Sequence, residues 1–265
     1  MRTDPIHAAV DFAELVNQLF AALIATAPGT PQQTEPSLGG KLLYVAELDP
    51  LGRPLVVAAN IAGAASLAAT TDQDAQKQAI RDGVVDFLVN SLDEALRILK
   101  NQVRKRETVA VCVAGAPEAV EREMLERGVL PDLLPPGEGI RSKIDIFLKQ
   151  GARRVQIVPE DQRQVLLAWH VAQEPARWLA KLDNVALDCL NAEDWQARRW
   201  LRLAPRYLGR LAQGVRLLAC DQESAERLIN AIRNEVNRGD IPVPVEFLVR
   251  GPGPRPEHRL RFEKL

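Results

Sequence analysis

The middle of the chain alternates between short apolar runs and longer amphipathic or Ala-rich segments. An apolar run at 42–46 enters a turn at 47–53, and a long run of small apolar residues, 54–65, leaves it. Two structures fit this pattern: a hairpin across Asp-Pro-Leu-Gly, or a strand leading into a helix that starts at Pro54. The length of the second run and its lack of strict alternation favour the helix. The apolar run 66–69 then starts a second parallel strand, which gives half of a dinucleotide-binding fold.

The same alternation continues further along the chain. The pattern predicts strands at 84–89 and 109–114 and helices over 72–82, 91–103 and 117–127. Ser91 and Glu94 form a capping box at the start of the second of these helices. Strands that alternate with helices at this spacing indicate a parallel sheet.

Residues 6–26 carry apolar side chains at helical spacing, which predicts an amphipathic helix. Its apolar face must be covered by another element or by a second subunit. The Pro-rich segment 27–37 has the composition of a linker. We therefore expect the helix to be an appendage, or the arm of a homodimer.

The second half of the chain starts at a Pro- and Gly-rich hinge, 135–139. Beyond it the pattern predicts strands at 155–158, 164–169, 215–220 and 243–249, helices at 140–150, 175–190, 192–211 and 221–236, and a loosely held tail at 251–256. The expected fold class is α/β: a Rossmann-like parallel sheet with flanking helices, plus a second, smaller α/β or α+β region. The expected parts are 1–38, 39–137 and 138–265.

Composition narrows the function classes. A net charge of −1 gives no electrostatic footprint for nucleic acid, and no apolar run is long enough to span a membrane. Three scattered cysteines are typical of reduced thiols. We therefore expect a cytoplasmic protein that binds neither nucleic acid nor membrane.

Few residues are candidates for chemistry. His170 follows a predicted strand, where it would act as a base or be an ordinary interface histidine. Cys112 lies among valines and is expected to be a small buried hydrophobe. Cys189, Cys220 and three distant histidines form no metal-ligand spacing. The sequence assigns no catalytic residue and no metal site.

Several stretches resemble the Rossmann-like domain of urocanase (urocanate hydratase). They are Ala58–Ala64, Leu67–Ala68, Arg81–Gly83, Ser91–Leu96 and Glu126–Leu133. A shorter pair of stretches, Leu217–Asp221 and Ala225–Leu228, resembles a segment near the end of the urocanase core. Urocanases bind NAD and add water to urocanate, so the resemblance implies a Rossmann-like fold, an NAD site and lyase ancestry. The catalytic Cys of the family lies in a His- and Gly-rich context that neither Cys189 nor Cys220 has.

The cofactor motifs of the family are altered here. Its Gly-rich turn corresponds to 47–56, where Gly52 remains and Arg53 adds bulk. Two carboxylates in this turn would repel a diphosphate about 6 Å away by roughly 1 kcal/mol each. Thr70 stands where the family has a Glu for the ribose, and Arg81 either complements the helix dipole or reaches a ligand.

Gly52, Arg53, Thr70 and Arg81 are therefore the candidate cofactor-site residues, although the expected cofactor is none. The expected function is a urocanase-related scaffold that binds a ligand or protein without hydratase activity. The alternative is an NAD-dependent hydro-lyase in which Arg53 and backbone donors replace the glycines. A third possibility is a small-molecule or nucleotide ligand at the strand ends.

Overall fold

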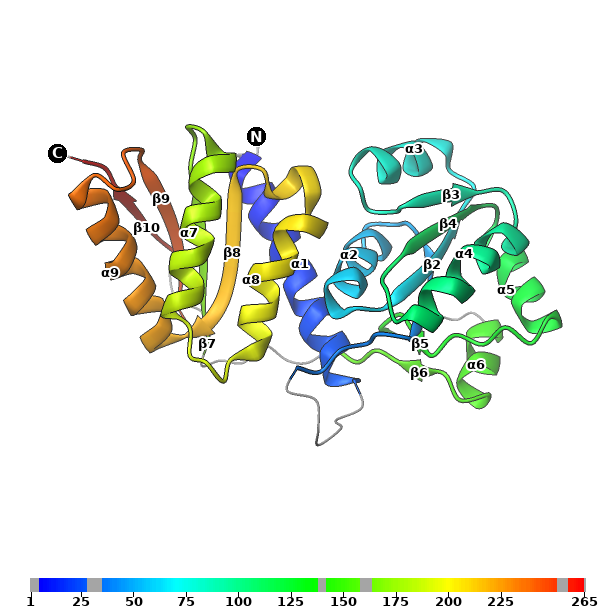
Figure 1. Cartoon of the computed structure of the whole chain (residues 1–265). Helices are drawn as coiled ribbons and strands as arrows, with labels where there is room; N and C mark the ends of the chain where they lie inside the picture. Colours follow the sequence, from blue (N-terminus) through cyan, green and yellow to red (C-terminus); the bar gives the residue numbers. More distant parts are fainter. Residues whose placement is uncertain (1–4, 28–34, 138–141, 158–163, 252–256, 265) are drawn as a thin grey trace. The chain divides into compact units, whose positions relative to one another are not determined.

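A computed structural model describes residues 5–27, 35–137, 142–157, 164–251 and 257–264. The chain divides into two compact units, one made of Met1–Asn17 with Pro159–Leu265 and the other of Gln18–Val158. Each contains one sheet, so we call them the antiparallel-sheet unit and the parallel-sheet unit (Figure 1). Each unit is described by itself.

The parallel-sheet unit confirms the predicted Rossmann-like sheet. Its strands are β1 (Leu42–Glu47), β2 (Ala65–Thr70), β3 (Phe87–Val89), β4 (Ala110–Ala114), β5 (Leu133–Leu134) and β6 (Arg153–Arg154). They pair in the order β3-β4-β2-β1-β5-β6, and every pair is parallel. The turn after β1 leads into a helix and not into a hairpin.

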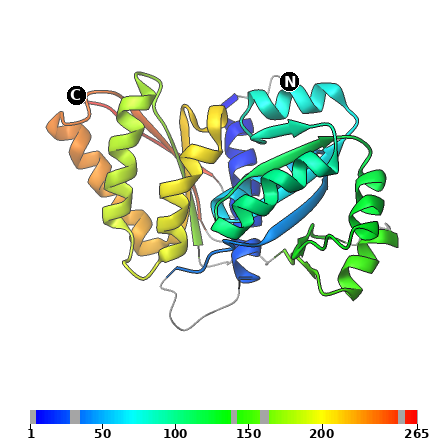
Figure 2. The same cartoon turned by 45° about the vertical axis from the view of Figure 1, so that its right-hand side comes forward.

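Helices cover both faces of this sheet. They are α2 (Gly52–Ala62), α3 (Gln73–Arg81), α4 (Leu92–Lys105), α5 (Pro117–Glu126) and α6 (Ser142–Lys149). Side chains of α4, α5 and α6 form one buried cluster with Tyr44 and its neighbours on the same face, and Figure 2 shows α4 lying across the strands. Helix α2 contacts β1 and β2 from the side of Val45, which is the opposite face because side chains alternate along a strand.

The sheet extends beyond residue 137, where the predicted Rossmann-like domain ended. Strand β6 pairs with β5, and the contact-based division of the chain falls after Val158. The strand predicted at 155–158 is wrong: β6 lies two residues earlier, and residues 155–157 form no strand. The hinge residues 138–139, the start of the predicted helix at 140 and the tail 252–256 lie outside the described residues.

The antiparallel-sheet unit contains β7 (Gln164–His170), β8 (Val215–Asp221), β9 (Val245–Arg250) and β10 (His258–Phe262) in the order β10-β9-β7-β8. Helices α7 (Pro175–Cys189), α8 (Trp195–Tyr207) and α9 (Gln222–Arg238), with the short 3-10 helix η1 (Gly209–Ala212), complete it. The long helices lie against one face of the sheet (Figure 1). Strand β10 was not predicted, so the expectation that 243–249 held the last strand is wrong.

Helix α1 (Pro5–Ala25) confirms the predicted amphipathic helix. In its first half, Glu14 and Asp11 approach Arg250 of β9, at 2.5 and 3.8 Å. Its apolar side chains, among them Val16 and Phe20, are fully buried within the chain. The homodimer expected from this helix stays a prediction. Among the described residues, no helix is both long and apolar enough to cross a membrane.

Candidate functional site

The carboxyl edge of the parallel sheet is the place where this architecture positions a ligand. Strand β1 connects through α2 to β2 on one side, whereas β5, on its other side, connects through α6 to β6. The connections therefore diverge between β1 and β5. Open parallel sheets bind ligands in the crevice at such a switch point. The β1–α2 turn lies at this carboxyl edge, directly after β1.

The side chain of Asp49 forms the main hydrogen bonds of this turn. Its Oδ1 accepts hydrogen bonds from the backbone N–H groups of Leu51, at 2.9 Å, and Gly52, at 2.7 Å. The N–H of Arg53 donates to the backbone oxygen of Asp49 at 3.2 Å. Pro54 has no N–H. The donors at the start of α2, which in a dinucleotide fold point at the pyrophosphate, are therefore bonded to Asp49.

Gly52 lies where helix α2 presses against the end of β1. A Cβ at this position would lie 1.8 Å from the backbone oxygen of Glu47 and 3.2 Å from Cγ1 of Val45. No side chain fits at the first distance, so only glycine permits this approach. The glycine that survives from the family's turn thus serves helix-to-strand packing.

Arg53 points to the far end of the next helix and not to the turn. Its guanidinium is 2.5 Å from Asp82, and about a fifth of each side chain is exposed, 23% and 18%. Asp82 also accepts a hydrogen bond from Gln78 at 2.8 Å. Arg53 therefore joins α2 to the residue that follows α3, and this contact competes with any role in neutralising a phosphate.

Thr70, at the end of β2, is buried, with 1% of its surface exposed. Its hydroxyl accepts a hydrogen bond from the N–H of Asp72, which in turn caps α3. Its backbone oxygen accepts from Gln76 at 2.7 Å and from the N–H of Gly115 at 3.2 Å. Thr70 thus orders the β2–α3 connection. Arg81 is the exposed last residue of α3 and adjoins the Arg53–Asp82 pair.

These residues do not fit a diphosphate. The helix donors are bonded to a carboxylate that already carries negative charge, Arg53 is paired elsewhere, and the ribose position holds a buried hydroxyl. The sequence indicated the two acidic residues of the turn but not that Asp49 turns back onto its own backbone. The signal for this contact was Asp at the start of a Pro-Leu-Gly turn, a common Asx-turn arrangement.

The cysteines do not supply a nucleophile. All three are free, and burial raises the pKa of Cys112 and of Cys220 to about 12. Burial also raises the pKa of the half-buried Cys189. Thiolates are the reactive form, so Cys112 and Cys220 are unreactive at neutral pH. In the described part of the chain, no group of three His, Cys, Asp or Glu side chains is placed to hold a metal.

The best-matching motif stretches have structural roles. Arg127 forms a bidentate ion pair with Asp93, which joins the end of α5 to the start of α4. Asp132 accepts from Lys41 at 2.8 Å and from the N–H of Leu42 at 2.9 Å, so it ties β5 to the amino end of β1. Half of the predicted capping box is present, because Ser91 accepts from the N–H of Glu94, whereas the Glu94 carboxylate accepts from the N–H of the preceding residue, Asn90. These residues therefore stabilise the fold.

Comparison with protein families gives the same relationship. Residues 23–136 match the model described as the urocanase Rossmann-like domain. This range contains β1 to β5 and helices α2 to α5. The match supports the urocanase relationship that the motif stretches indicated.

Proposed function

We propose that this urocanase-related chain is not a working urocanate hydratase and that its parallel-sheet unit is a scaffold for a ligand or protein other than NAD. The contact of Asp49 with the first N–H groups of α2 is the observation that carries this proposal. The carboxylate takes the position and the charge of a phosphate oxygen.

The energetics favour the internal carboxylate over an incoming diphosphate. Losing a capping side chain costs about 1 kcal/mol. If the carboxylate stays, a phosphate charge about 4 Å away is repelled by about 1 kcal/mol in bulk water and about 4 kcal/mol at a surface-like dielectric. The described contacts offer no compensation, since Arg53 is engaged by Asp82.

The alternative is an NAD-dependent hydro-lyase, and the family match is what favours it. It requires Asp49 to leave the α2 donors when the cofactor binds. Under this alternative, purified protein supplied with NAD would remove the ultraviolet absorbance of urocanate. We expect a flat trace.

The direct test is the nucleotide content of the purified protein. Mass spectrometry of the denatured sample should find no NAD, and calorimetric titration with NAD should give no binding heat. Copurified or titratable NAD would contradict the proposal.

A matched pair of variants tests the role assigned to Asp49. Asp49→Ala frees the α2 donors, whereas Asp72→Ala frees those of α3, where Asp72 accepts from Asp74 and Ala75. Each should cost about 1 kcal/mol of stability. Inorganic pyrophosphate should raise the melting temperature of Asp49→Ala more than that of Asp72→Ala. An equal response would show that Asp49 does not guard an anion site.

A further inference from the structure

Strand β3 ends the parallel sheet, and it carries apolar side chains that are exposed. It pairs with β4 on one side, and in the part of the chain that the structure describes no strand pairs with its other side. Phe87 is 46% exposed and Leu88 is 39% exposed. Ile80, in the last turn of the preceding helix α3, is 42% exposed. We call these three residues the β3 patch.

The side chains of β3 are exposed on both faces of the sheet. Val89 belongs to the same buried cluster as Tyr44 and residues of α4, so Phe87, two residues earlier, points to that face. Leu88 points to the opposite face, which α2 covers. A partner on one face would leave the other side chain exposed. The β3 patch therefore fits a partner that extends the sheet at its edge.

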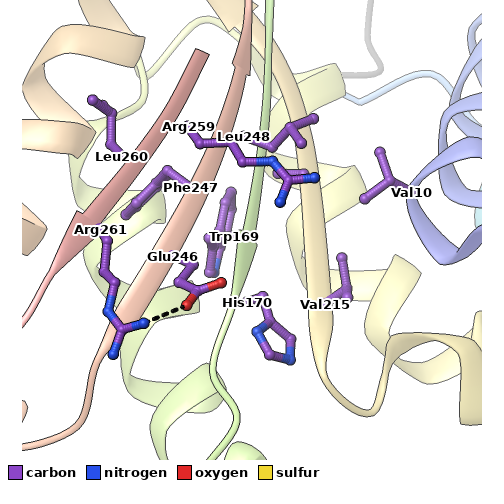
Figure 3. Close-up of a pocket in the computed structure, with 11 residues that line it drawn as sticks. Val10, Trp169, His170, Val215, Glu246, Phe247, Leu248, Arg259, Leu260 and Arg261 are labelled. Carbon is purple, nitrogen blue, oxygen red and sulfur yellow. Dashed lines mark hydrogen bonds and ion pairs between the residues drawn. The ribbon is translucent and has the colours of Figure 1, made fainter. Parts of the chain in front are cut away.

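The other terminal strands carry charges. Strand β10 contains Arg259 and Arg261, and Figure 3 shows Arg261 directed at Glu246 of the neighbouring strand, 3.2 Å away. The charged residues of the two remaining terminal strands are Arg153 and Arg154 in β6 and Arg216 and Asp221 in β8. Charged side chains on a terminal strand discourage its pairing with another chain. Among the terminal strands that the structure describes, β3 alone has no charged residue.

We propose that two copies of the chain pair through β3 across a twofold axis. Two identical strands related by such an axis run antiparallel, so a pairing centred on Leu88 places it opposite Leu88 of the partner subunit. Phe87 then lies opposite Val89 of the partner subunit, and an aromatic side chain opposite a β-branched one is a favourable cross-strand pair. The two parallel sheets would join into one continuous sheet.

The charges of the neighbouring helices fit a second copy of the same chain. The Glu94 carboxylate of α4 accepts from the N–H of Asn90, directly after β3, so Glu94 lies on the β3 side of the helix. Lys105 lies on the same side at the other end of α4, roughly three helical turns further. In an antiparallel pair, each Glu94 would approach Lys105 of the partner subunit. Helix α3 has the same polarity, with Asp74 in its first turn and Arg81 in its last.

The first test is the mass of the full chain in solution. Sedimentation velocity between about 1 and 100 µM should show a monomer that becomes a dimer, with a dissociation constant of roughly 10 µM. This dimer does not involve α1, whose apolar side chains are buried within the chain. It is also independent of the proposed function, because the β1–α2 turn takes no part in it. A chain that stays monomeric at about 100 µM would overturn the proposal.

A matched pair of variants locates the interface. Leu88→Lys places a charge on the β3 edge, whereas Leu130→Lys places one before β5, at a leucine that is 44% exposed. The dissociation constant should rise at least tenfold in Leu88→Lys and stay unchanged in Leu130→Lys, and melting temperatures verify that both fold. A dimer that persists in Leu88→Lys, or is lost equally in both variants, would refute the assigned surface.

Leu88→Cys tests the geometry of the pairing. Directly opposite residues of antiparallel strands have Cα atoms about 4.5–5.5 Å apart, and a disulfide spans about 4.4–6.8 Å. Mild oxidation should therefore convert the Leu88→Cys protein into a covalent dimer. Leu130→Cys and the wild type, in which Cys189 is half-buried, should stay unlinked. Failure of Leu88→Cys to form a covalent dimer would contradict a pairing centred on Leu88.

Discussion

Two residues of the β1–α2 turn show how strongly a single side chain can determine a site. The carboxylate of Asp49 accepts hydrogen bonds from the first N–H groups of α2. Gly52 has no side chain, which lets the helix lie against the backbone of Glu47. In a phosphate-binding turn the glycine also lets the backbone reach the ligand. Here the packing role remains while the donors face an internal carboxylate.

Because α2 approaches β1 so closely at Gly52, we expect Gly52→Ala to lower the stability of the protein, whereas Gly→Ala in a helix usually raises it. Alanine in a helix normally stabilises by about 1 kcal/mol relative to glycine. The new Cβ would meet the backbone of Glu47 at 1.8 Å, so we expect a loss of about 3 kcal/mol or more. Urea denaturation followed by circular dichroism measures it.

Gly115→Ala is the control for this prediction. A Cβ at Gly115 would meet only Cγ1 of Val113, at an ordinary 3.8 Å. Its stability should change by about 0.5 kcal/mol or less. A neutral or stabilising Gly52→Ala would show that α2 does not press against β1 as described.

The buried thiols predict a pattern of chemical modification. With a pKa of about 12, Cys112 and Cys220 would each be about one part in ten thousand thiolate at pH 8, and both are fully buried. Iodoacetamide should therefore add at most one group to the native protein, at Cys189, and three groups in denaturant. Mass spectrometry of peptides identifies the sites. Native-state labelling of Cys112 would contradict the predicted burial.

At the scale of single elements, the start of α9 links stability to pH. Burial alone would raise the pKa of Asp221, but hydrogen bonds from the N–H and hydroxyl of Ser224 outweigh it, and the pKa is lowered from 3.8. A folded-state pKa below the unfolded one gives stability that is present above the unfolded pKa and is lost as pH falls through the folded pKa. The stabilisation by Asp221 should therefore disappear in acid below pH 3.8.

Asp221→Asn keeps a capping oxygen but cannot titrate, so its stability should lack this part of the pH dependence. Asp221→Ala should lose about 1 kcal/mol at neutral pH. Urea midpoints between pH 3 and pH 6 measure the difference between the wild type and each variant. A difference between wild type and Asp221→Asn that stays constant over this range would contradict the assigned role.

Most helices and strands could be predicted from the sequence, and one strand could not. Apolar periodicity predicted α1, the parallel sheet and the helices α7 to α9, because each buries a regular set of side chains. Strand β10 was missed because it is a short edge strand whose sequence, His-Arg-Leu-Arg-Phe, is rich in charge.

The candidate site was predictable in its residue types and not in its contacts. The sequence identified the acidic turn and the remaining Gly52. It could not indicate that Arg53 pairs with Asp82, which is 29 residues away, or that Asp49 bonds to its own backbone. A short polar side chain can hydrogen-bond to solvent, to a ligand or to the local backbone, and which of these partners it meets depends on the folded structure.

For the whole molecule, the distribution of tryptophan allows the two units to be followed separately. All four tryptophans lie between residues 169 and 200, within the antiparallel-sheet unit. Trp169, Trp178 and Trp200 are buried there, as expected for core residues. Tryptophan fluorescence therefore reports on this unit alone, whereas far-ultraviolet circular dichroism reports on both sheets.

Each unit has its own sheet and core, so we expect a variant in one unit to leave the other unit's transition in place. Gly52→Ala should lower the urea midpoint measured by circular dichroism and leave the fluorescence midpoint unchanged. Leu228→Ala, which removes a fully buried side chain of α9, should lower the fluorescence midpoint by an amount equivalent to about 2–5 kcal/mol. If both probes shift together in both variants, the two units unfold as one cooperative structure, which would contradict the expected independence.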